Sequence, residues 1–153
     1  MDWIVQFVGR LHPLVVHLPI GILFLAFLFE CISQFERFKE IGSAVQPSLL
    51  FGGIFSVAAV ASGLSLSQEG GYDDTLLQRH EYMGIATAVF TVILYFARLR
   101  IERLSGSEKK IKLIRVFSFL PVVVLLSITG HLGGSMTHGE DYLFESLIVE
   151  QKA

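Results

Sequence analysis

Five histidines lie at the ends of apolar segments in this sequence. His12 and His17 begin the first apolar segment, His80 begins the third, and His131 and His138 close the fourth. Imidazole is a common metal ligand, and ionisable side chains inside membrane-like segments are rare and usually functional. The five histidines therefore predict a ligand cluster at one end of the molecule.

The neighbours one helical turn away distinguish these histidines, because residues i and i+4 share a helix face. His17 is followed by Gly21, and His80 is followed by Gly84. Small residues beside an imidazole let helices approach closely or leave room for a flat macrocycle bound through the ring. His131, next to Gly130, shares this pattern.

The other two histidines are more ambiguous. His12 precedes Pro13 and either caps the first helix or acts as a ligand. At about 100° per residue, His12 and His17 lie roughly 140° apart on a helix, so they are poor partners for one metal. His138 lies in the polar string THGEDY, and we expect it to be peripheral.

Two arginines adjoin the histidines. Arg10 and Arg79 precede His12 and His80 closely. They are either interfacial anchors or partners for the carboxylates of a haem, which a guanidinium binds through two hydrogen bonds.

The composition assigns these residues to a membrane protein. The chain has 153 residues, of which 52% are hydrophobic and 17% charged. Four apolar stretches approach the roughly 20 residues that a spanning helix needs. They lie at about 13–35, 47–66, 74–100 and 112–132. We predict an all-α, four-helix integral membrane bundle that forms a single domain over residues 1–153.

The charge pattern predicts the orientation, because basic loops stay in the cytoplasm. The connections after the first and third stretches hold most of the lysines and arginines, namely Arg37, Lys39, Arg98, Arg100, Arg103, Lys109, Lys110, Lys112 and Arg115. Both termini and all five histidines are then expected on the outer, periplasmic face of a bacterial inner membrane, with Glu30 at the cytoplasmic boundary.

Further features restrict the chemistry. Cys31 is the only cysteine and no CxxCH occurs, so this chain alone offers no intrachain disulfide and no covalently attached haem. The basic residues are explained by topology, so we expect no nucleic-acid partner. Apolar residues at helix-like spacing in 3–11 and 143–148 predict short interfacial helices at both ends of the chain.

Three strings carry a resemblance to a known family: GRLHPLVVHLPIGIL, GGYDDTLLQRHEYMGIAT and SITGHLGGSMTHGEDYL. They resemble a bacterial family of four-helix membrane proteins of unassigned function, the domain of unknown function 2231 type. The resemblance covers residues 9–143. Such domains are fused to, or lie beside, cytochrome c or Rieske-type ferredoxin modules, which implies an electron-transfer role.

Three functions follow from these observations. The first is a membrane b-type haem protein in which two histidines ligate the iron of one haem, or four ligate two haems. It would pass electrons between quinol or another membrane partner and an external cytochrome or ferredoxin domain. The second is a copper or zinc site at the outer face. The third is a non-catalytic anchor or assembly subunit of a respiratory complex.

The expected site residues are His12, His17, His80 and His131 as metal ligands, with Arg10, Arg79, Gly21 and Gly84 around the cofactor. No nucleophile–base spacing suggests a hydrolytic enzyme. A stripe of small residues on the second stretch also permits self-association.

Overall fold

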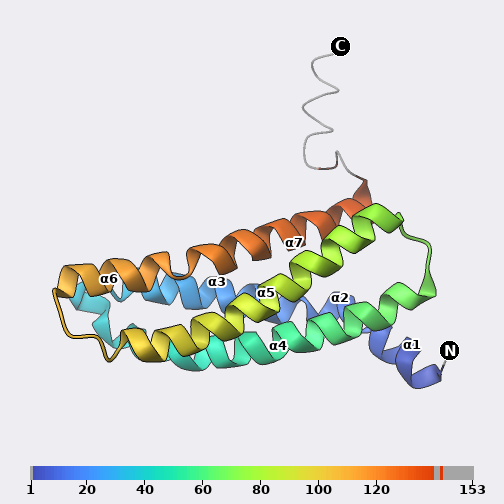
Figure 1. Cartoon of the computed structure of the whole chain (residues 1–153). Helices are drawn as coiled ribbons and strands as arrows, with labels where there is room; N and C mark the ends of the chain where they lie inside the picture. Colours follow the sequence, from blue (N-terminus) through green and yellow to red (C-terminus); the bar gives the residue numbers. More distant parts are fainter. Residues whose placement is uncertain (1, 140–141, 143–153) are drawn as a thin grey trace, which may run out of the picture.

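The computed structural model describes residues 2–139 and Tyr142, and within this part of the chain every regular element is helical (Figure 1). The elements in chain order are α1 (Trp3–Arg10), α2 (His12–Val15), α3 (His17–Ile32), the 3₁₀ helix η1 (Glu36–Ala44), α4 (Val45–Leu66), the 3₁₀ turn η2 (Ser67–Glu69), α5 (Asp74–Ile101), α6 (Glu108–Phe117) and α7 (Leu120–His138). The predicted all-α bundle is confirmed.

Four helical stretches are long and apolar enough to cross a membrane. They cover Trp3–Ile32, Glu36–Glu69, Asp74–Ile101 and Glu108–His138. Long apolar helices satisfy their own backbone hydrogen bonds, which a bilayer requires of any spanning segment. The expected four-span architecture therefore agrees with the structure.

The two middle spans match their predicted bounds closely, and the outer two are interrupted. Pro13 lies in the first turn of α2 and Pro19 in the first turn of α3, so each lacks the N–H that would bond back to the preceding helix. Pro121 likewise opens α7. Helix α7 continues past residue 132, where the predicted fourth span ends, through Gly133 and Gly134 to His138.

The predicted helix at the N-terminus is present as α1, which packs against α4. At Gly9 the two backbones are so close that an added Cβ would lie 2.8 Å from the backbone nitrogen of Leu66. The tail residues 143–148, for which a second such helix was predicted, lie outside the described residues.

A capped turn begins α5. Gly70 and Gly71 adopt φ values of +75° and +90°, which favour glycine. The Asp73 carboxylate then accepts a hydrogen bond of 2.8 Å from the backbone N–H of Leu76. Asp73 is therefore the N-cap of α5, and its carboxylate satisfies one of the free N–H groups of the first turn.

Helix α5 changes its neighbour along its length, and this determines where the bundle is hollow. In its second half, the backbone carbonyl of Tyr95 accepts a hydrogen bond from Gln46 of α4. In its first half, Thr87 bonds to Thr129 of α7 with the two hydroxyl oxygens 3.1 Å apart. Figure 1 shows the oblique course of α5 between the two helices. Helices α4 and α5 therefore diverge toward one end, which we call the histidine end.

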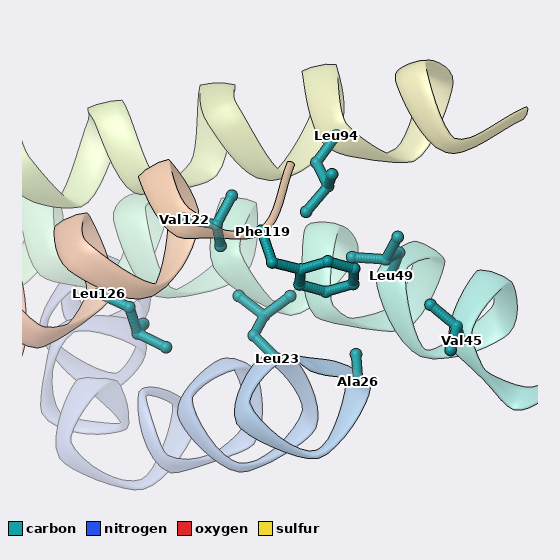
Figure 2. Packing of buried hydrophobic residues seen from close by; sticks show 8 residues of the cluster. All are labelled: Leu23, Ala26, Val45, Leu49, Leu94, Phe119, Val122 and Leu126. Atoms are coloured by element: carbon teal, nitrogen blue, oxygen red, sulfur yellow. The ribbon is translucent and has the colours of Figure 1, made fainter. Parts of the chain in front are cut away.

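Buried apolar side chains from α3, α4, α5 and the start of α7 form the hydrophobic core (Figure 2). Its largest member is Phe119, which is completely buried and packs against the ring of Phe27. The other buried members are Leu23, Ala26, Val45, Leu49, Leu94, Val122 and Leu126. Close packing of these side chains fixes the relative positions of the helices, which continue from the core to the histidine end.

A buried ion pair lies at the end opposite the histidines. Glu30 of α3 is fully buried, and its carboxylate lies 2.9 Å from a guanidinium nitrogen of Arg98 of α5. Arg98 also contacts Glu102 at 3.2 Å, and Gln34 donates a hydrogen bond of 2.8 Å to Glu30. The sequence placed Glu30 at the membrane boundary, whereas its carboxylate points into the bundle. A buried carboxylate requires such a partner.

Candidate functional site

Two histidine rings face each other across the gap between α2 and α5. The ring centroids of His12 and His80 are 6.3 Å apart, and the ring planes are nearly perpendicular, at 85°. Both residues are partly buried. At this distance and angle the two rings lie edge to face.

The His12 ring is anchored to α4. Its Nδ1 lies 3.0 Å from the backbone carbonyl oxygen of Ala59 and 3.1 Å from the hydroxyl oxygen of Ser62. The Ser62 hydroxyl itself donates to the Ala59 carbonyl, at 3.0 Å. A carbonyl only accepts, so Nδ1 carries the hydrogen and Nε2 keeps a lone pair.

The His80 ring is anchored to α7 in the same way. Its Nδ1 lies 3.1 Å from the backbone carbonyl oxygen of Thr129. This carbonyl lies one turn before Gly133 on the same helix. Each histidine thus donates Nδ1–H to a neighbouring helix and keeps Nε2 as the free, basic nitrogen.

Two glycines make room for the rings. A Cβ added at Gly63 would lie 2.9 Å from Cε1 of His12, and one added at Gly133 would lie 3.1 Å from Cε1 of His80. Carbon atoms normally approach to about 3.5–4.0 Å. A glycine on the adjacent helix is therefore required beside each imidazole, and the two sides of the site are built alike.

A cavity of about 670 Å³ surrounds the two histidines. A volume of roughly 300–1,000 Å³ is typical of sites for cofactors and drug-sized ligands. Its walls are mostly apolar, and residues of α2, α3, α4, α5 and α7 contribute, among them Val16, Ile20, Val60, Ile85 and Leu126. Tyr72, Glu81 and Thr137 add polar groups.

The remaining histidines lie at the same end but do not join this pair. His17 is exposed on the cavity wall, and its Nδ1 lies 2.6 Å from the carbonyl oxygen of Pro13 in the preceding turn. The exposed ring of His131 stacks on Tyr142 with centroids 5.9 Å apart. His138 also lines the cavity, and its ring lies 5.7 Å from the Tyr142 ring.

Four other residues were predicted to surround a cofactor, and of these only Gly84 lines the cavity. Arg10 is exposed and forms an ion pair with Glu69, at 3.1 Å. Arg79 is exposed and Gly21 faces open space. Gly84 lines the cavity, and a Cβ there would meet only Thr129, at 3.8 Å.

Sequence reasoning missed the residues that position the pair. Ala59 and Gly63 belong to a stripe of small residues at i+4 spacing, a visible signal without an assigned role. Gly133 was interpreted as the end of a helix. No sequence feature identifies the Thr129 carbonyl as a partner of His80, because any residue has a carbonyl.

Among residues 2–139 and Tyr142, no group of three or more His, Cys, Asp or Glu side chains is placed to hold a metal ion.

Residues 10–141 match the model of the family DUF2231, described as predicted membrane proteins. The chain belongs to this family. The match covers the first spanning stretch from residue 10 onward and the other three in full, and it includes both members of the histidine pair. No curated protein and no solved structure matches the chain.

Proposed function

We propose that this DUF2231 protein binds one b-type haem between His12 and His80 and transfers electrons at one face of the membrane. The observation that carries the proposal is the spacing of the two rings. Imidazole nitrogens bind first-row metals at about 2.0–2.1 Å. With ~1.2 Å from nitrogen to ring centre on each side, two axial imidazoles have centroids about 6.5 Å apart, slightly more than the 6.3 Å between His12 and His80.

The hydrogen bonds support the same assignment. Metal-ligating histidines usually donate their other ring N–H to a carbonyl or carboxylate, which fixes the tautomer and makes the ligating nitrogen more basic. His12 and His80 both have this arrangement, with Nδ1 on the carbonyls of Ala59 and Thr129. The cavity around them has the volume and the apolar walls that suit a porphyrin.

The number of ligands argues against the copper or zinc alternative, since only two imidazoles converge among the described residues. It also favours a single haem over two. An iron with two axial histidines has no open coordination position, which suits electron transfer rather than oxygen chemistry. His17 and His131 are then not axial ligands in this proposal.

The proposed place of the protein is the bacterial inner membrane, with the basic connections in the cytoplasm and the histidine end at the periplasmic face. There an external cytochrome c or ferredoxin domain can approach the haem, and a lipid-soluble partner can reach it from the bilayer. Arg79 is exposed near this end and can dock such a partner or anchor at the headgroups, whereas Arg10 is paired with Glu69.

The deciding experiment is an absorbance spectrum of the purified protein from haem-replete cells. The wild-type protein is expected to show a Soret band, a sharp α-band after reduction and one extractable haem per chain. Replacement of His12 or His80 by alanine should abolish the low-spin spectrum. His131→Ala is the matched control, because His131 is an exposed histidine at the same end and should leave the spectrum unchanged.

A second candidate is a non-catalytic membrane anchor or assembly subunit. It is supported by the same two hydrogen bonds, since His12 ties α2 to α4 and His80 ties α5 to α7 without any ligand. Asparagine at either position retains an N–H for the carbonyl but cannot replace the imidazole as an iron ligand. A colourless wild-type protein whose stability drops in His12→Ala and recovers in His12→Asn would favour the anchor.

A further inference from the structure

The third histidine on the cavity wall is exposed within an apolar span. His17 lies in the first turn of α3 and belongs to the Trp3–Ile32 stretch. Placing a polar ring toward hydrocarbon is costly and usually marks a functional residue. The pair between His12 and His80 does not use His17, so its position needs another explanation.

The hydrogen bond of His17 defines what it can recognise. Its Nδ1 lies 2.6 Å from the carbonyl oxygen of Pro13, so Nδ1 carries the hydrogen. Nε2 therefore has a lone pair available to a hydroxyl donor. The ring is held by its own preceding turn and needs no other helix to orient it.

The surroundings restrict the ligand further. His17 is exposed while its cavity neighbours Val16 and Ile20 are apolar, so the ligand arrives from the lipid and has an apolar body. The bundle is also open at this side, because α3 and α7 pack together far less than α3 and α4 or α5 and α7 do. A soluble anion or a phospholipid headgroup does not combine these properties.

We infer that His17 binds the headgroup of a lipid-soluble hydroquinone at the open side of the cavity, with Nε2 accepting a hydrogen bond from its hydroxyl. A hydroquinone is apolar, enters from the bilayer and offers a phenolic O–H. The inference rests on the proposed function, because a hydroquinone bound at His17 would be the membrane-side electron donor to the proposed haem.

The chemistry balances with an external one-electron acceptor. Oxidation of one hydroquinone to the quinone releases two electrons and two protons. Two oxidised cytochrome or ferredoxin domains take the electrons one at a time. The first O–H bond breaks with its proton moving to Nε2 of His17, and the second proton passes to water.

The test measures binding of a benzohydroquinone with a short alkyl chain to the purified protein by titration calorimetry, with the haem spectrum recorded on the same samples. Wild-type protein should bind it saturably. His17→Ala should weaken binding tenfold or more, equivalent to about 1.4 kcal/mol. His131→Ala should bind like wild type, and the haem content of both variants should be unchanged.

Several results would overturn the inference, and they differ from failure of the proposed function. Equal affinity in wild type and His17→Ala, no binding by haem-loaded wild type, or equal competition by a sterol would each exclude a hydroquinone site at His17. Loss of haem in His17→Ala would make His17 an iron ligand instead. A colourless protein whose hydroquinone binding depends on His17 would refute the haem and leave this site intact.

Discussion

Alanine at Gly63 should damage the site while improving the helix that carries it. Gly63 lies inside α4, where Gly→Ala normally stabilises a helix by up to about 1 kcal/mol. The added Cβ would lie 2.9 Å from Cε1 of His12. Ordinary carbon contacts begin near 3.5 Å, so the His12 ring must move by about 0.6 Å or more.

That displacement is large for a metal ligand. Metal–ligand distances tolerate only about 0.2 Å, so in the proposed haem site His12 would no longer reach the iron with its normal bond length. Changes in groups that orient ligands typically reduce affinity by about 10–100-fold. We expect Gly63→Ala to lose haem affinity by this factor and to shift the remaining haem from a low-spin to a high-spin spectrum.

The assay is a haem titration of detergent-purified protein, followed by the Soret and α-bands, with thermal unfolding measured in parallel. Gly21→Ala is the matched control, since Gly21 is also inside a helix but an added Cβ meets nothing within 4 Å. A Gly63→Ala protein with wild-type haem affinity and spectrum, indistinguishable from Gly21→Ala, would refute the assignment of His12 as a ligand held against α4.

Three further predictions test the fold around the site. Replacing Arg98 by methionine leaves Glu30 buried without its cation and should lower the free energy of unfolding by about 3–5 kcal/mol. Glu102→Ala removes the more exposed partner of Arg98 and should lower it by less than about 1 kcal/mol. Equal losses of stability in the two variants, measured by thermal unfolding, would contradict the burial of the Glu30–Arg98 pair. Gly52→Ala should destabilise by about 1–3 kcal/mol, because the new Cβ collides with the buried Leu23 side chain; an unchanged melting temperature would show that this core is loosely packed. The distribution of basic residues predicts that the C-terminus lies outside the cytoplasm and the α5–α6 connection inside it. An alkaline phosphatase, which is active only outside the cytoplasm, should therefore be active when fused after the last residue and inactive when fused into the α5–α6 connection. The reverse pattern would place the histidine end in the cytoplasm.

The sequence was sufficient for features that depend on position along a helix axis. Apolar length predicted four spans, and the middle two end within two residues of the observed α4 and α5. A helix rises about 1.5 Å per residue, so residues near the segment ends must lie near the ends of the bundle. For this reason the prediction that all five histidines gather at one end agrees with the structure.

The tertiary structure decided which side of each helix faces a neighbour and which helices are neighbours. Glycine neighbours favoured His17, His80 and His131 over His12, yet His12 is the residue that faces His80. The reason is that α5 contacts α4 in its second half and α7 in its first half, which opens a gap opposite α2. No pattern of neighbouring residues in the sequence reveals this change of partner. The same holds for Glu30, whose burial depends on Arg98 of another helix. The chain alone therefore determined which end carries the chemistry, and packing determined which two imidazoles face each other there.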